Sequence, residues 1–189
     1  DVGPSGFTFN QYVIVDDEPL LFHTGPRALF PHLVDAINSV TPVHGLRWIT
    51  FGHVESDECG SMNEFLGTAP ESRVAHGGVG CMVSLDDLAD RPPVAWADGE
   101  VIELGRHRVR HLDTPHVPHG WESRVLFEEV TGTLLCGDLF TQLGDGPALA
   151  THDIVDAALG AEDVFGATCL TPSTGPTIRA LADLSPATL

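Results

Sequence analysis

The feature that most constrains this chain is a histidine and two carboxylates placed directly after a short apolar strand. Residues 47–51 (Arg-Trp-Ile-Thr-Phe) predict that strand, and Gly52 ends it. His53, Glu55 and Asp57 follow at alternate positions. Ionised carboxylates this close together repel one another unless a cation neutralises them or one takes up a proton. The pattern therefore favours a loop that converges on one or two cations, with a solvated acidic loop as the alternative.

Two later segments place similar side chains after strands. In residues 112–121, two prolines stiffen a turn that presents His116 and His119. We expect His116 to bind a metal through a neutral imidazole nitrogen. His119 is a candidate catalytic residue, as a hydrogen-bond donor to a metal ligand or as a proton relay. The alternative is a turn residue that caps the backbone. Asp138 ends an apolar strand, where an Asp is costly unless it is paired or metal-bound. Its two interpretations are a carboxylate shared by two cations and a cap of the next turn.

Strand patterns dominate both halves of the chain, and helical patterns punctuate them. Because strands and helices do not alternate regularly, the order predicts two packed sheets with helices outside, rather than a doubly wound nucleotide fold. The predicted strands are 7–15, 20–24, 47–51, 73–75, 101–104, 106–112, 124–130 and 134–138, and the predicted helices are 29–40, 153–165 and 177–184.

The composition excludes several classes of function. The 189 residues include 27 acidic side chains against 9 basic ones, all of them Arg, with a formal charge of −18. This charge argues against nucleic acid and against an anionic membrane surface as partners. No apolar run reaches the roughly 18–20 residues of a spanning helix, and residues 1–4 lack the features of a signal peptide. We therefore expect a cytoplasmic protein whose four separated cysteines are free thiols.

Several common catalytic motifs are missing from the sequence. The glycines of residues 77–80 lack the spacing of a dinucleotide-binding loop, and neither a P-loop nor a GxSxG elbow is present. No segment resembles a flavodoxin or another flavin module, so we expect no flavin in this chain. We expect the histidines outside the clusters, among them His23 and His111, to be structural or exposed. Chemistry is thus expected from the three strand-end clusters.

Together, the His-x-Glu-x-Asp motif, the Pro-His turn and the Gly-Asp strand end resemble the metallo-β-lactamase superfamily. The resemblance is closest to its flavodiiron branch, including stand-alone oxygen-binding di-iron domains, because the hydrolase branch usually has His where Glu55 stands. It covers nearly the whole chain in order. It implies an α/β fold, the four-layer αβ/βα sandwich of two mixed sheets packed face to face with helices outside. It also implies one metal on His53, Glu55 and His116, and a second on Asp57, with Asp138 bridging.

The sequence departs from the family pattern at two positions. Glu58 stands where the family often has a histidine after the motif Asp, and it is either a substitute oxygen ligand or a side chain facing solvent. The family also supplies a late histidine for the second metal, whereas residues 171–176 contain none, and His152 is a poor substitute. We expect the missing ligand to lie beyond Leu189, so that residues 1–189 form a single domain truncated at its C-terminus.

The implied ligands are two imidazoles and three carboxylates, which with a bridging hydroxide would balance two divalent cations. Carboxylate enrichment favours iron, with zinc or manganese as alternatives. The first hypothesis is a di-iron oxidoreductase that binds or reduces O2 or NO, with electrons from a separate flavin reductase or electron-transfer protein. The second is a dinuclear zinc hydrolase of esters, lactams, thioesters or phosphodiesters. The third is a non-catalytic oxygen sensor or binding module. The sequence is also compatible with a homodimer.

Overall fold

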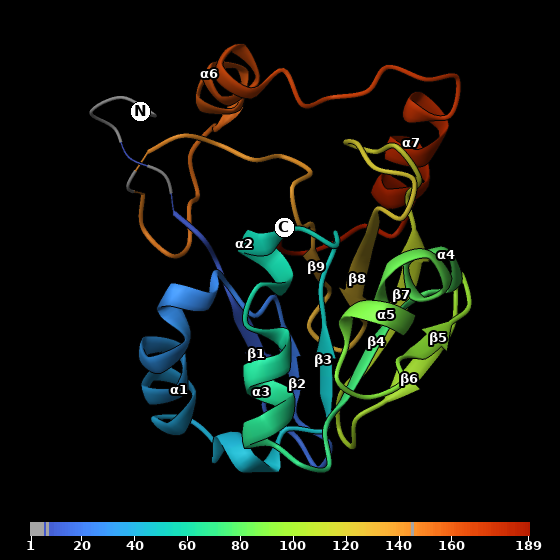
Figure 1. Cartoon of the computed structure of the whole chain (residues 1–189). Coiled ribbons are helices and arrows are strands. Elements are labelled where there is room, and N and C mark those ends of the chain that lie inside the picture. Colours follow the sequence, from blue (N-terminus) through green and yellow to red (C-terminus); the bar gives the residue numbers. More distant parts are fainter. Residues whose placement is uncertain (1–5, 7, 145) are drawn as a thin grey trace.

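The computed structural model describes residues 6, 8–144 and 146–189, whose strands form two sheets (Figure 1). The first sheet has the order β1-β2-β3-β4-β5, with β1 antiparallel to β2 and the later neighbours parallel. The second has the order β6-β7-β8-β9 and is antiparallel. The strands are β1 (Tyr12–Ile14), β2 (Leu20–Phe22), β3 (Trp48–Thr50), β4 (Arg73–Gly77), β5 (Val94–Trp96), β6 (Val101–Glu103), β7 (Arg108–Asp113), β8 (Arg124–Glu128) and β9 (Thr133–Leu135).

Short helices connect and cover the sheets. The α-helices are α1 (Phe30–Asn38), α2 (Ser56–Cys59), α3 (Met62–Thr68), α4 (Gly78–Gly80), α5 (Asp86–Leu88), α6 (Val155–Phe165) and α7 (Thr174–Asp183). A π-helical segment, η3 (Cys81–Leu85), joins α4 to α5, and the 3-10 turns η1 (Arg27–Leu29) and η2 (Val43–Gly45) lie on either side of α1. Within the described part of the chain, no helix is both long and apolar enough to cross a membrane.

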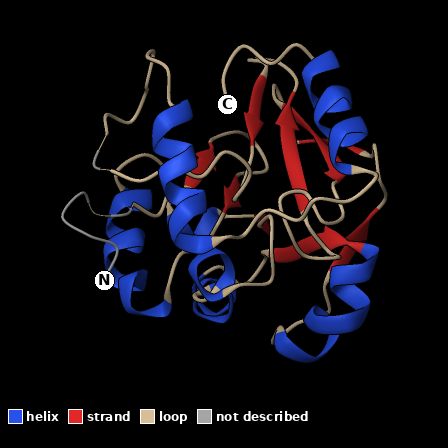
Figure 2. Cartoon of the chain, turned by 90° about the horizontal axis from the view of Figure 1, so that it is seen from above, coloured by secondary structure: helices blue, strands red, loops and turns tan. Residues whose placement is uncertain are grey.

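The alternation of side chains along the strands builds the core in layers. Successive strand residues face opposite ways, so Leu21 packs under the helices that cover the first sheet, while Leu20 packs between the sheets with Leu126. On the far face of the second sheet, Val125 packs with Leu181 of α7. The two sheets therefore lie between two helical layers, as Figure 2 shows from above. The predicted sandwich is confirmed, with the first sheet mixed and the second antiparallel.

The predicted strands are present but shorter than the apolar patterns that indicate them. The range 7–15 gives β1, and Phe7 lies outside the described residues. The sequence patterns miss β5 and the helical segments of residues 56–68 and 78–88. These helical segments are interrupted every turn or two, and a helix of one turn cannot display an apolar repeat of 3.6 residues.

Strand pairing brings several chain segments to one end of the sheets. In the parallel pair β2–β3, Phe22 lies opposite Thr50, so His23 emerges beside the loop that follows β3. The backbone N–H of His23 donates to the Thr50 carbonyl at 2.8 Å. From the second sheet, the N–H of Arg124 donates to the Gly52 carbonyl at 3.2 Å. The loops after β2, β3 and the strands of the second sheet are thus held close together.

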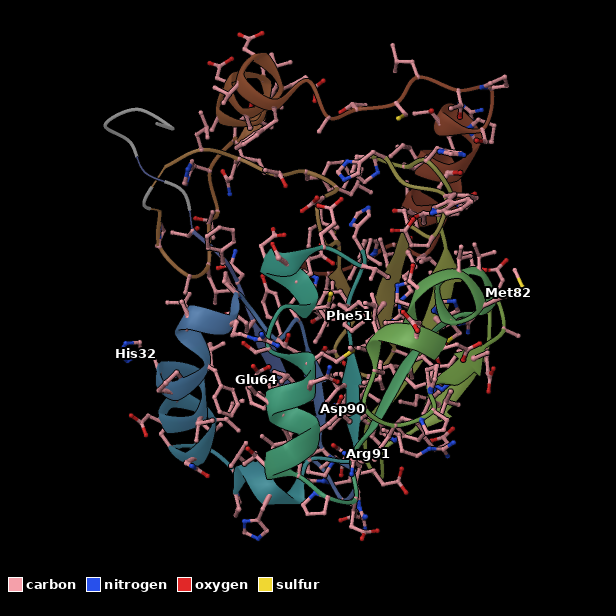
Figure 3. The ribbon with its side chains drawn as sticks, viewed as in Figure 1. His32, Phe51, Glu64, Met82, Asp90 and Arg91 are labelled. Atoms are coloured by element: carbon pink, nitrogen blue, oxygen red, sulfur yellow. The ribbon has the colours of Figure 1, made fainter. Side chains whose placement is uncertain are left out.

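We predict that Phe51→Ala lowers the free energy of unfolding by about 3–5 kcal/mol, because deletion of a fully buried ring leaves a cavity. Phe51 is 0% exposed in the cluster between the first sheet and its helices. Met82→Ala is the control, since Met82 is 71% exposed and points away from the body (Figure 3). Its effect should stay within about 0.5 kcal/mol. Urea unfolding measures both variants, and equal losses would contradict the prediction.

Candidate metal centre

Three donor side chains from three different loops meet at this end of the sheets. His53 follows β3, His119 lies between β7 and β8, and Asp138 follows β9. One ligand atom of each lies within 4.8 Å of the other two. Nε2 of His119 is 3.4 Å from Oδ2 of Asp138, and Nδ1 of His53 is 3.9 Å from the same oxygen. The arrangement offers two nitrogens and a carboxylate oxygen to one ion.

A hydrogen bond of the His53 ring determines which of its nitrogens can bind a metal. Nε2 lies 3.1 Å from the His119 carbonyl. Because a carbonyl only accepts, Nε2 carries the proton, and the neutral ring keeps its lone pair on Nδ1. That lone pair faces the carboxylates of Glu58, at 3.4 Å, and Asp138. Acceptors that face one another need an extra proton or a cation between them. Metal-binding histidines commonly donate the N–H of their other ring nitrogen to a carbonyl, as His53 does here. The donor set therefore fits a metal ion.

The carboxylate of Glu58 lies beneath this group and is not in solvent. The residue is 2% exposed, and Oε2 accepts the backbone N–H of His53 at 2.5 Å. The same oxygen lies 3.2 Å from Nε2 of His23. Gly52 leaves room for it, because a Cβ at that position would lie 3.1 Å from Oε2 of Glu58. Of the two interpretations of Glu58, a side chain facing solvent is therefore wrong.

Burial and charge compete in setting the pKa values of the site. Burial raises the pKa of Glu58, but the imidazoles of His23 and His53 outweigh it and hold the pKa well below the usual carboxyl range. Burial lowers the pKa of His53, yet Glu58 and Asp138 raise it to about 9. Burial and the charge of Glu58 raise the pKa of Asp138. Without a metal, a protonated His53 ring balances the buried carboxylates, and a bound cation would replace its proton.

A buried arginine fastens the loop that begins the site. Arg124 is fully buried, and its Nε donates to the Phe51 carbonyl at 2.7 Å. A terminal nitrogen donates to Nδ1 of His111 at 2.5 Å, so Nε2 of His111 carries the proton and donates to Asp113 at 2.7 Å. His111 is thus a structural, hydrogen-bonded residue of the sheet, one of the two expectations for it. These bonds fix the end of β3 and therefore the position of His53.

Two of the predicted carboxylates lie beside the donor group. Oε1 of Glu55, in the loop before α2, is 3.2 Å from Nε2 of His119. Asp57, on α2, is half-buried and close enough to Asp138 to raise the pKa of that carboxyl. Glu55 adds negative charge next to His119, and Asp57 adds to the charge acting on Asp138, which favours a cation there.

The two histidines of the 112–121 turn have different surroundings. His116 is exposed, and it is not part of the donor group found among the described residues. His119 is partly buried and supplies Nε2 to that group. Spacing alone does not reveal this difference, because the direction of each side chain depends on the turn's backbone, where His116 has a φ of 62°. The structure therefore brings His119, and not His116, to His53 and Asp138.

The sequence patterns give no role to His23, which nevertheless lies at the site. It is 9% exposed and directly follows the apolar strand β2. A signal was present, because a histidine after an apolar strand is also the pattern that singles out His53. By contrast, the hydroxyls of Thr171 and Thr174, where the resemblance would supply the late histidine, bond within their own segment at the start of α7.

Two sheets between helices, with histidines and carboxylates gathered at one end of the strands, define a domain of the metallo-β-lactamase fold with a candidate metal site. Residues 7–165 match a family model described as "ODP family beta lactamase". The chain therefore belongs to the ODP family. The predicted membership of the metallo-β-lactamase superfamily, close to the flavodiiron branch, is confirmed.

Known relatives share this fold at low sequence identity. The chain is 24% identical over 143 residues to the rubredoxin-oxygen oxidoreductase of Megalodesulfovibrio gigas, covering 75% of this chain and 35% of that protein. The structure of rubredoxin oxygen:oxidoreductase from Desulfovibrio gigas has a TM-score of 0.79 and 21% identity, covering 97% of this chain and 46% of that one. This chain thus spans less than half the length of these oxidoreductases.

Two structures of the chemotaxis sensor ODP are similar over more of their length. The apo state from T. denticola has a TM-score of 0.78 and 20% identity, covering 93% of this chain and 74% of that one. A structure of the sensor with a diiron species has a TM-score of 0.79 and 20% identity, covering 98% and 78%. At these identities the likeness shows the fold.

We predict that the stability of the metal-free protein depends on pH through Glu58 and His53. A lowered carboxyl pKa contributes stability above the ordinary value of 4.5, and this is lost as the pH falls below it. A raised imidazole pKa contributes stability below the ordinary value of 6.5, and this is lost as the pH rises towards about 9. The thermal midpoint should therefore be highest between the two ordinary values.

Glu58→Gln should flatten both slopes, because an amide neither titrates nor attracts a protonated imidazole. Glu71→Gln is the control, since that side chain is 78% exposed in its ion pair with Arg47. Thermal unfolding of chelator-treated protein across this pH range measures the effect. Identical pH profiles for the wild type and Glu58→Gln would show that the buried pairing does not control stability.

Proposed function

We propose that this domain binds iron at the group formed by His53, His119 and Asp138, and that it binds O2 or NO there. The observation that carries the proposal is the meeting of His53, His119 and Asp138, with acceptor atoms turned towards one another. Such a group is unfavourable without a proton or a cation among its members. Membership of the ODP family and the diiron species of a related sensor support iron as that cation.

We propose that one ion is held by four side chains, those of His53, Glu55, His119 and Asp138. His119 takes the position that the resemblance gives to His116, because its Nε2 lies within 3.4 Å of both Glu55 and Asp138. The second ion of a di-iron pair would use Asp57 and share Asp138. A donor set rich in carboxylates favours iron over zinc.

Bound iron would supply the redox chemistry on which the binding of O2 or NO depends. The residues of this chain orient and fix its ligands. The His119 carbonyl holds the His53 ring so that Nδ1 faces the carboxylates. Glu58 accepts the backbone N–H of His53, and Arg124 holds the Phe51 carbonyl of the same loop. The fixed loop keeps the ligand nitrogen aimed at the ion.

Oxygen binding and oxygen reduction differ in their need for a partner. Reduction requires electrons, so we propose a separate flavin reductase or electron-transfer protein as the donor if the domain turns over. Membership of the ODP family supports binding as the basic activity. We also propose a cytoplasmic location, where the four free cysteines would stay reduced.

We predict that His119→Ala loses at least one bound metal ion per chain, whereas His116→Ala keeps the full complement. The reason is that Nε2 of His119 belongs to the donor group, while His116 is exposed. Elemental analysis of iron-loaded protein, with circular dichroism to check folding, measures both variants. Loss of metal from His116→Ala alone would reverse the assignment and return His119 to the role of a proton relay.

We predict that stepwise addition of O2 to an anaerobic solution of the iron-loaded wild type changes its visible absorption. The same titration of His53→Ala should give no change. His32→Ala is the control, because His32 points away from the body on α1 (Figure 3). A protein that isolates with zinc, hydrolyses model esters and shows no response to O2 would instead support the hydrolase hypothesis.

A further inference from the structure

We propose that His23 and Glu58 bind the second metal ion of this centre, so that His23 supplies the imidazole which residues 171–176 lack. The inference rests on the proposed function, because it names ligands for the second ion of that centre. It is argued from the geometry of a buried histidine that no sequence motif identifies.

The hydrogen bond of the His23 ring leaves one nitrogen aimed at a carboxylate. Nδ1 lies 3.3 Å from the Asn10 carbonyl, so Nδ1 carries the proton and the neutral ring keeps its lone pair on Nε2. Nε2 is buried and lies 3.2 Å from Oε2 of Glu58, yet it has no hydrogen-bond partner among the described residues. The residue is 9% exposed. This is the arrangement of His53, whose other nitrogen is also held by a backbone carbonyl.

The backbone of His23 is held in an unfavourable conformation to achieve this. Its φ is 66°, in the left-handed region that residues with a side chain rarely adopt. Such strain persists where the surrounding structure enforces it, and it concentrates at functional sites. Here the enforcing contacts are the N–H bond to Thr50 and stacking of the ring on Phe22, with centroids 4.2 Å apart.

The separation of the two side chains matches that of two ligands on one ion. Metal–nitrogen and metal–oxygen bonds of about 2.0–2.2 Å, at roughly 90–110° to each other, put neighbouring ligand atoms about 3.0–3.4 Å apart. Nε2 of His23 and Oε2 of Glu58 are 3.2 Å apart. Nε2 of His119 stands at the same distance from Oε1 of Glu55 in the first ion's group.

Further carboxylates are near enough to complete the second site. A Cβ at Gly137 would lie 3.4 Å from Oε1 of Glu58 and 3.9 Å from Nε2 of His23, so the backbone just before Asp138 packs against the pair. Asp138 itself belongs to the first ion's group, with Oδ2 3.4 Å from Nε2 of His119 and 3.9 Å from Nδ1 of His53. Asp138 therefore contacts the His53–His119 group, while the residue before it packs against the His23–Glu58 pair.

The competing explanation is a structural ion pair, in which a protonated His23 balances a buried Glu58. The two explanations differ in what a glutamine at position 23 does. An amide can donate to the Asn10 carbonyl or to Glu58, so it would preserve a structural contact, but it is a poor metal ligand. His23→Gln therefore separates a ligand from a positioning residue.

The test is the number of ions bound by the full chain. Metal-free wild type, His23→Gln, His23→Ala and His32→Ala are loaded anaerobically with Fe²⁺ and, in parallel, with Co²⁺, and bound metal and visible absorption are measured. We expect two ions per chain for the wild type and for His32→Ala, and one for both His23 variants. In the Co²⁺ series, the absorption of the first ion should persist in the His23 variants. Thermal unfolding of the metal-free proteins checks that each variant is folded.

Each outcome decides between the explanations. Two ions in His23→Gln, or a single ion in the wild type, would overturn the inference while leaving the first site intact. Failure of the wild type to bind any iron or cobalt would instead sink the proposed function. If His23→Ala fails to fold, His23→Gln alone still decides the question.

Discussion

Acceptor atoms that face one another at the buried end of the strands are the constraint on which the rest of this structure depends. Glu58 lies between the imidazoles of His23 and His53, and Asp138 faces the same nitrogen of His53 as Glu58 does. Each ring has its other nitrogen committed to a backbone carbonyl, so the lone pairs point inwards. Only added protons or cations make such a set stable at low exposure. The sheets, the glycines and the fixed loops all serve to hold this set together.

The fold places these atoms by strand pairing. Parallel register sets the end of β2 beside the end of β3, and the second sheet is tied to the same loop through Arg124. A strand end can present a side chain to a shared edge without burying its own backbone polar groups, because the strand itself is paired. Residues far apart in sequence therefore converge within 4.8 Å without any long motif.

The sequence predicts the strand ends better than the directions of the side chains that follow them. His53 and Asp138 are recognisable because an acid or a histidine after an apolar run is unusual and costly. His116 and His119 are indistinguishable by spacing, since a turn with φ of 62° at His116 decides which ring points inwards. His23 stands out least, because no carboxylate follows it; its acidic neighbour, Glu58, comes from helix α2. Helices of one turn, such as α2, cannot be predicted from the sequence, because one turn is too short to show an apolar repeat of 3.6 residues.

Anomalous diffraction at the iron edge from crystals of the iron-loaded chain would test the central claim most directly. We expect two peaks, one bounded by His53, His119 and Asp138 and the other by His23 and Glu58. A map without peaks at this end of the sheets, with Glu58 still in direct contact with both imidazoles, would contradict it.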